Sequence, residues 1–172
     1  MPHISPSVPG DVPTILRLYD LASEHMRKAG AVVVWPAFER ALVETEVAEG
    51  RQYKLVVDGE VACVWVVALA DADIWGQRER GDAVYVHRIA TNPAFRGRGF
   101  VQRVTDWAAG FAHGRGLRYV RLDTMGENRK LIDVYTGAGF AFLGMHDVPD
   151  ATHLPAHYRE GQVALFELDV RD

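Results

Sequence analysis

The sequence predicts an α/β protein in which helices cover both faces of a mixed β-sheet. Three observations support this fold class. Two amphipathic helical segments come first, and two apolar runs joined by Asp58-Gly59 follow them. Strand-like and helix-like segments then alternate toward the C-terminus. The resulting order is α-α-β-β-β-α-β-α-β-β, which is typical of a sheet layered between helices.

The composition indicates one globular domain of ordinary character. The 172 residues suffice for a sizeable core, and no repeat, low-complexity tract or linker interrupts them, so we expect a single domain over residues 1–172. A formal net charge of -4 argues against general nucleic-acid binding. The single cysteine, Cys63, lies in an apolar run and is interpreted as a buried small hydrophobe. Without a signal segment or a membrane-length apolar run, we expect a cytoplasmic protein that contacts no membrane.

The first two helices are predicted from apolar spacing and from residues that start or stop helices. Asp11 is a plausible cap for the first helix, and Gly30 ends it. Trp35-Pro36 is interpreted as the start of a second helix that runs toward Gly50. The apolar face of the first helix comprises Val12, Ile15, Leu16, Tyr19, Ala22 and Met26.

The strands are predicted from apolar runs bounded by turn residues. Asp58-Gly59 between two such runs is the strongest short signal for a β-hairpin. A polar loop, 71–82, precedes the central strand, and a second long loop is expected over 145–158. The predicted strands are Tyr53–Val57, Val61–Leu69, Ala83–Ala90, Tyr119–Thr124, a run from Gly139-Phe140 to Gly144, and Val163–Val170, with a helix over Glu127–Gly137 before the last two.

The central stretch has the layout of a phosphate site. The strand Ala83–Ala90 stops at Thr91-Asn92-Pro93, Arg96-Gly97-Arg98-Gly99 follows, and a helix begins near Phe100. The first N–H groups of a helix are unpaired and carry partial positive charge, and glycines allow the backbone to approach an anion. The motif alone also fits an ordinary turn or an RNA-binding segment. It is neither a P-loop nor a dinucleotide fingerprint.

Two blocks of residues resemble the GNAT superfamily of N-acetyltransferases. The first runs from His87-Arg88-Ile89-Ala90-Thr91 through Phe95-Arg96-Gly97-Arg98-Gly99. The second comprises Arg121-Leu122-Asp123-Thr124, Glu127-Asn128, Tyr135 and Gly139-Phe140. The closing strand and the loop with Trp75 are similar to a bacterial branch that acts on small molecules. The chain departs from the family at Val101, where Gly or Ala is usual, although the Val101 N–H can still donate.

The resemblance implies a central mixed sheet of about seven strands flanked by about four helices. It implies acetyl-CoA-dependent transfer of an acetyl group to a primary amine of a small molecule, by direct attack in a ternary complex. Acetyl-CoA would be the co-substrate, and no metal is expected. The residues that would bind it are Ile89, Ala90, Thr91, Arg96, Gly97, Arg98, Gly99, Phe100, Val101, Asn128, Leu131 and Tyr135.

The resemblance also implies catalytic roles for two residues. Tyr135 would act as the general acid, since a phenol with a pKa near ~10 can protonate or hydrogen-bond a leaving thiolate whose thiol has a pKa near ~8.5. His87 would act as the base or contact the acceptor, because an imidazole titrates near neutral pH. Tyr85 is an alternative base through water. Each of these residues could instead have a purely structural role. Tyr135 would then be a core tyrosine, His87 a core or surface histidine, and Asn128 a helix cap.

The acceptor site is expected in the variable segments of the chain. Trp35, Trp75 and Tyr85 are candidate contacts, although Trp35 also fits a helix-start packing residue. His146, His153 and His157 lack a metal-binding pattern. The acceptor could instead be a protein or peptide, or the chain could be a non-catalytic acyl-CoA sensor. The resemblance allows a homodimer, because the last strands of this fold often pair across a dimer.

Overall fold

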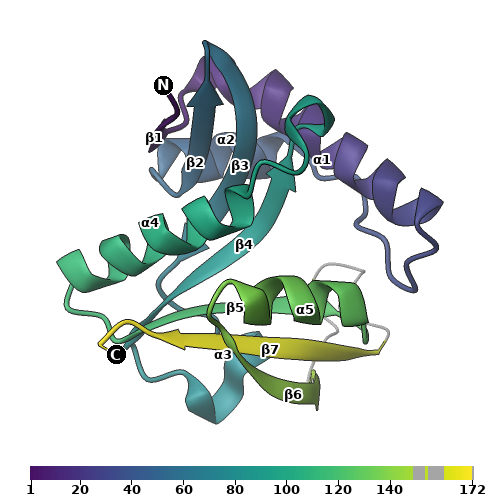
Figure 1. Ribbon diagram of the computed structural model, residues 1–172. Coiled ribbons are helices and arrows are strands. Elements are labelled where there is room, and N and C mark those ends of the chain that lie inside the picture. The colour runs from purple at the N-terminus through teal and green to yellow at the C-terminus, as the bar shows by residue number, and fades with distance from the viewer. Residues whose placement is uncertain (149–153, 155–160, 172) are drawn as a thin grey trace. The chain divides into compact units, whose positions relative to one another are not determined.

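The computed structural model describes residues 1–148, 154 and 161–171. Within them the chain forms a seven-stranded mixed sheet of order β1-β2-β3-β4-β5-β7-β6 (Figure 1). The sheet confirms the predicted fold class. The strands are β1 His3–Pro6, β2 Gln52–Val57, β3 Glu60–Ala68, β4 Ala83–Thr91, β5 Tyr119–Met125, β6 Ala141–Asp147 and β7 Gln162–Asp169. The helices are α1 Val12–Lys28, α2 Arg40–Ala48, α3 Ala72–Trp75, α4 Phe100–Gly114 and α5 Arg129–Gly137.

The chain forms two compact units that share the strand β4. The first unit comprises Met1–Val67 and His87–Phe100, and the second comprises Ala68–Val86 and the chain from Val101 onward. In the first unit, β1, β2 and β3 form an antiparallel ribbon. In the second unit, the start of β4 pairs in parallel with β5, and β7 pairs antiparallel with both β5 and β6. No helix in the described part of the chain is both long and apolar enough to cross a membrane.

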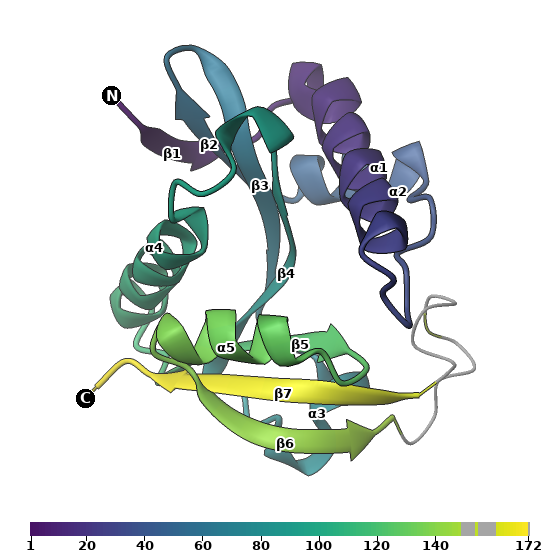
Figure 2. The same ribbon diagram turned by 45° about the vertical axis from the view of Figure 1, so that its right-hand side comes forward.

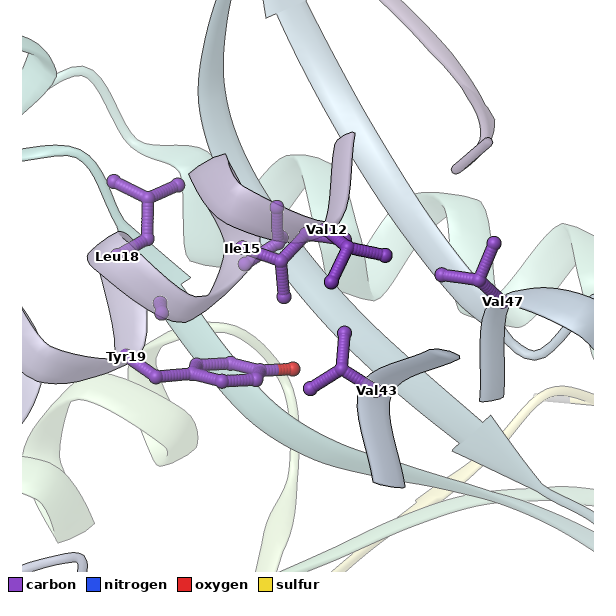
Figure 3. Close-up of a cluster of buried hydrophobic side chains, with 8 residues drawn as sticks. Val12, Ile15, Leu18, Tyr19, Val43 and Val47 are labelled. Atoms are coloured by element: carbon purple, nitrogen blue, oxygen red, sulfur yellow. The ribbon is translucent and has the colours of Figure 1, made fainter. Parts of the chain in front are cut away.

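The core of the first unit is built by α1 and α2 (Figure 3). Helical spacing places Val12, Ile15 and Tyr19 on the buried face of α1, as the sequence predicts. They pack with α2 and with one residue each from β3 and β4. The buried cluster comprises Val12, Ile15, Leu18, Tyr19, Val43, Val47, Val64 and Ala90.

The second helix begins later than the sequence predicts. It starts at Arg40, after Glu39 in an extended conformation, and residues 31–39 form no helix. Pro36 disfavours helical backbone at Trp35. Trp35 instead packs edge-on against Tyr19 and Phe38, with ring centroids 6.1 Å and 5.9 Å away. The aromatic contacts therefore replace the predicted first turn.

The hairpin between β2 and β3 confirms the Asp58-Gly59 prediction. Both residues have positive φ, 51° and 84°, and Val57 pairs with Glu60 across the turn. This is the backbone that a two-residue hairpin requires. The strand β1, which pairs with β2 from His3↔Val56 to Pro6↔Tyr53, is absent from our sequence prediction. It is a four-residue edge strand with a proline, so it carries almost no alternation signal.

In the second unit, helices cover both faces of the β5-β7-β6 sheet (Figure 2). Trp75 of α3 packs with Val163 and Leu165 of β7, whereas Tyr135 of α5 packs on Phe166. Alternate residues of a strand point to opposite faces, so β7 is buried on both. The short helix α3 lies in the segment 71–82 that the sequence indicates as loop.

The loop predicted over 145–158 starts later than expected, because β6 continues to Asp147. His146 lies on this strand, and its Nε2 is 2.9 Å from the Leu143 carbonyl oxygen. His153 and His157 lie outside the described residues.

Candidate functional site

The segment after β4 is anchored to β3 by Asn92, which is 4% exposed. Its backbone N–H donates to the Ala62 carbonyl at 2.8 Å, and its side-chain amide donates to the Val61 carbonyl at 3.1 Å. Its side-chain oxygen accepts from the Ala94 N–H at 3.1 Å and so caps the short helix Pro93–Phe95. One buried side chain therefore fixes where the next residues leave the sheet.

Those next residues, Arg96 to Gly99, form an exposed loop with open space around its glycines. Gly97 and Gly99 have φ of 78° and 70°, in the left-handed region that favours glycine. A Cβ atom at either position would meet no atom within 4 Å. The requirement for glycine is therefore conformational and not steric.

Two arginines and a helix start make this loop electropositive. The Arg98 guanidinium lies 5.0 Å from the centroid of Phe95, which holds it in place. Among the described residues, no carboxylate forms an ion pair with Arg96 or Arg98. The helix α4 begins at Phe100, so unpaired N–H groups and its positive dipole end follow the loop. This combination suits a phosphate ligand.

The end of β4 carries Ile89, Ala90 and Thr91, three of the residues that the family resemblance implies as acetyl-CoA contacts. Ala90 is buried against α1, and Ile89 and Thr91 are half-buried. The Thr91 hydroxyl donates to the Cys63 sulfur at 3.8 Å. Burial raises the pKa of Cys63 to about 12, so its thiol stays protonated and unreactive. This agrees with its interpretation as a buried hydrophobe.

His87 differs from the sequence expectation in its acidity. Lost hydration, followed by the positive charges of Arg88 and Arg51, lowers the pKa of His87 to about 4. The argument that this imidazole titrates near neutral pH is therefore wrong. At pH 7 the ring is neutral and can accept a hydrogen bond, but it is a weak base. Its catalytic role stays a prediction.

The lowered pKa of His87 predicts a pH dependence of stability. In the unfolded chain the His87 imidazole takes up a proton near its ordinary pKa of 6.5, whereas in the folded chain it stays neutral down to about pH 4. The unfolded state binds more protons in this window, so the free energy of unfolding falls as the pH falls from 6.5 toward 4. We expect His87→Gln to flatten that slope in urea unfolding curves. The exposed His113→Gln is the control, and parallel curves for wild type and His87→Gln would contradict the prediction.

The helix α5 carries the other group of predicted residues. Asn128 caps it, since its side-chain oxygen accepts from the Leu131 N–H at 3.2 Å. The cap interpretation of Asn128 is thus confirmed, while its contact with the coenzyme stays a prediction. Tyr135 is half-buried, and its ring packs against Phe140 and Phe166 with centroids 6.1 Å and 5.2 Å away. These contacts fix the ring about two turns after the cap.

Loss of the cap should be separable from loss of a ligand contact. We expect Asn128→Ala to lower the free energy of unfolding by about 1 kcal/mol, while Asn128→Ser largely preserves it because serine also caps helices. Thermal unfolding measures this difference. If coenzyme A binding weakens equally in both variants, Asn128 also contacts the ligand, whereas weakening in the alanine variant alone would reduce its role to capping.

Two of the three predicted acceptor contacts are core residues. Trp75 is 2% exposed and Tyr85 is 0% exposed. The Tyr85 hydroxyl accepts from Arg121 at 3.0 Å, and the Arg121 guanidinium also lies over Trp75 and donates to Glu167 at 2.8 Å. Burial raises the pKa of Tyr85, which excludes it as a base near neutral pH. These residues stabilise the second unit, and only Trp35 keeps partial exposure.

The structure also identifies an ion pair that our sequence analysis missed. Arg88 of β4 pairs with Glu46 of α2, and the two side chains are only 13% and 4% exposed. A signal was present, because Glu46 follows Val43 by three residues on the apolar face of its helix, and Arg88 interrupts an apolar strand. Charged residues in buried positions are rarely incidental.

Comparison with known proteins agrees with this geometry. The model of the acetyltransferase (GNAT) family matches residues 16–140. An uncharacterized N-acetyltransferase of Bacillus subtilis (strain 168), YesJ, is 26% identical over 150 residues, which is 83% of each chain.

Solved structures of the same fold are similar over almost the whole chain. A GNAT-family acetyltransferase from Listeria monocytogenes has a TM-score of 0.76 at 19% identity, with 98% of this chain and 94% of that chain covered. The protein yncA from Salmonella typhimurium, solved with its cofactor acetyl-CoA, has a TM-score of 0.71 at 13% identity, with 100% of this chain and 95% of that chain covered. The ribosomal-protein-S18-alanine N-acetyltransferase from Escherichia coli has a TM-score of 0.68 at 15% identity over 99% and 94%. From the family match, supported by these likenesses of fold, the chain belongs to the GNAT family of acetyltransferases.

Proposed function

We propose that this protein is an acetyl-CoA-dependent N-acetyltransferase that acetylates a primary amine of a small molecule by direct attack in a ternary complex. The observation that carries the proposal is the Arg96–Gly99 loop. It combines two left-handed glycines, two arginines without carboxylate partners among the described residues, and the start of a 15-residue helix. A pyrophosphate is the chemical group that these features suit best.

The coenzyme would be bound mainly by backbone groups. Amides from Arg96 to Val101 would donate to the pyrophosphate, and the two guanidinium groups would neutralise its charge. The pantetheine amides would pair with the backbone of Ile89, Ala90 and Thr91 as an added strand. The Ile89 N–H would donate to the oxyanion that forms when the thioester is attacked. Val101 can serve this loop because the phosphate needs its N–H and not its side chain.

The transfer would require one proton acceptor and one proton donor. The acceptor nitrogen attacks the thioester carbon and loses a proton, and the carbon–sulfur bond breaks to release a thiolate. The Tyr135 hydroxyl would donate a proton to that sulfur. His87, neutral above its pKa of about 4, could only accept a hydrogen bond or pass the amine proton on to water.

A protein or peptide acceptor is the second candidate. It is favoured by the likeness of fold to the Escherichia coli enzyme named for an alanine of ribosomal protein S18. A sensor that binds acyl-CoA without turnover is the third, and Tyr135 argues against it because binding alone requires no proton donor near the sulfur.

One assay tests these alternatives. The protein is incubated with acetyl-CoA and a panel of amines, amino acids, polyamines, aminoglycosides and short peptides, and release of the free thiol of coenzyme A is followed. Turnover with small amines supports the proposal, and turnover with peptides alone supports the second candidate. Acetyl-CoA binding without turnover across the panel would contradict the proposal and favour the sensor.

A further inference from the structure

We propose that Glu46 is a positioning residue that acts through Arg88 to hold the backbone of β4 in the conformation needed for acetyl transfer. The inference rests on the proposed function, which assigns the next residues, Ile89 to Thr91, to the thioester and pantetheine. Glu46, Arg88 and these residues all belong to the first unit. Neither Glu46 nor Arg88 was assigned a role by the sequence.

The backbone of β4 is strained at Arg88. Its φ is 51°, and the other described residue that has positive φ without being glycine is Asp58, in the tight hairpin turn. For arginine, which gains no local hydrogen bond from this conformation, the left-handed region is sterically unfavourable. Such a conformation persists only when the surrounding structure enforces it. Arg88 must therefore be held by its neighbours.

The side chain of Arg88 supplies that restraint. Its guanidinium pairs with Glu46 and lies over the rings of Tyr19 and Phe38, 5.2 Å and 4.9 Å from their centroids. The ion pair fixes the end of the side chain, and the two rings fix its plane. The strained residue is thus tied to α1, α2 and the segment between them.

A second set of contacts holds Tyr19 itself. Its hydroxyl donates to the Gln52 side-chain oxygen at 3.2 Å, and the Gln52 amide donates to the Trp65 carbonyl at 3.2 Å. Burial raises the pKa of Tyr19 to about 12, so the hydroxyl remains a donor. Hydrogen bonds from β2 and β3 therefore support the ring on which Arg88 lies.

The Glu46–Arg88 ion pair is not expected to stabilise the fold. Buried ion pairs lose hydration that their attraction often fails to recover. Here the pair is also incomplete, because Glu46 Oε2 and Arg88 Nη1 are buried without a hydrogen-bond partner among the described residues. Unsatisfied buried groups are destabilising. Backbone strain, a buried ion pair and two unsatisfied atoms therefore coincide at the residue immediately before Ile89.

The restrained conformation of Arg88 determines the orientation of the Ile89 amide. A residue in the left-handed region turns the peptide that follows it, so the conformation of Arg88 sets the direction of the Ile89 N–H. Without Glu46, Arg88 would relax toward ordinary strand geometry, and that N–H would rotate. An oxyanion donor acts only within a narrow range of distance and direction, so a small rotation reduces the rate.

The first test compares two glutamates of the same helix. Glu46→Gln should lower kcat for acetyl transfer at least about tenfold while coenzyme A affinity changes less than about threefold, because the phosphate loop is untouched. Glu44→Gln is the matched control, since Glu44 forms an exposed ion pair with Arg40 at 2.8 Å. It should leave both quantities unchanged. An unchanged kcat in folded Glu46→Gln would overturn the inference.

The second test varies the backbone at position 88 directly. Glycine adopts positive φ without strain and alanine does not, although both remove the guanidinium. We expect Arg88→Gly to retain more of kcat than Arg88→Ala, and equal values would contradict the backbone mechanism. This comparison also serves if Glu46→Gln does not fold.

A readout independent of activity separates this inference from the proposed function. In amide NMR spectra, Glu46→Gln should shift the signals of Ile89 and Ala90, and Glu44→Gln should not. If the wild type transfers no acetyl group, the proposed function fails, and these shifts still decide whether Glu46 holds β4. Unmoved Ile89 and Ala90 signals in Glu46→Gln would refute the positioning role.

Discussion

Alanine at both Gly97 and Gly99 is expected to weaken coenzyme A binding at least about a hundredfold. Each glycine has a φ that costs an alanine about 1–2 kcal/mol, so the double variant favours a relaxed loop. In a relaxed loop the amides from Arg96 onward no longer converge on one anion. The fold should persist, because a Cβ at either position meets no atom within 4 Å.

The control variant introduces the same backbone strain at two glycines outside the proposed coenzyme-binding loop. Gly30 and Gly50 have φ of 71° and 70°, end helices α1 and α2, and also have no atom within 4 Å of an added Cβ. The double alanine variant at these positions should lose similar stability and keep its affinity. Calorimetric titration with coenzyme A and thermal unfolding measure the two quantities. Equal losses of coenzyme A affinity in both double variants would show that the Arg96–Gly99 loop does not bind the coenzyme.

Removing the hydroxyl of Tyr135 is expected to lower kcat at least about tenfold with little change in acetyl-CoA affinity. Phenylalanine preserves the ring contacts with Phe140 and Phe166, so the packing of α5 should remain intact. The leaving thiolate would then lack its proton donor. Because the loss lies in the chemical step, single-turnover kinetics should slow by the same factor as steady-state turnover.

Tyr119→Phe provides the comparison within the same unit. Tyr119 is also half-buried, and its ring lies under Arg118 and Arg121, with guanidinium carbons 4.7 Å and 4.9 Å from the centroid. Its hydroxyl has no proposed role, so kcat should not change. An unaltered kcat in Tyr135→Phe would exclude Tyr135 as the general acid and favour its interpretation as a core tyrosine.

Where the structure agrees with the sequence, the determinants are local. Asp58-Gly59 produces the two-residue hairpin, and apolar spacing places Val12, Ile15 and Tyr19 on the buried face of α1. The exposed loop at Arg96–Gly99 and the helix after it follow from glycine and from the end of an apolar strand. Each of these features depends on neighbours a few residues away in the chain.

Where the two differ, contacts distant in sequence decide. Trp35 lies outside the predicted helix, where Pro36 disfavours helical backbone and Tyr19 of the distant helix α1 packs against the Trp35 ring. Trp75 and Tyr85 are buried, because Arg121 lies over the Trp75 ring and donates to the Tyr85 hydroxyl. Aromatic residues suit a core and a binding surface equally well, so their type alone does not distinguish the two.

The sequence alone thus determined the fold class, the hairpin, and the Arg96–Gly99 loop with the helix that follows it, because turn chemistry and periodicity are short-range properties. Only the tertiary structure decided the acidity of His87 and the conformation of Arg88. Desolvation and two nearby cations set the first, and an ion pair with Glu46, 42 residues away in the chain, restrains the second. Both effects depend on which groups the fold brings together, and no local pattern of residues encodes that.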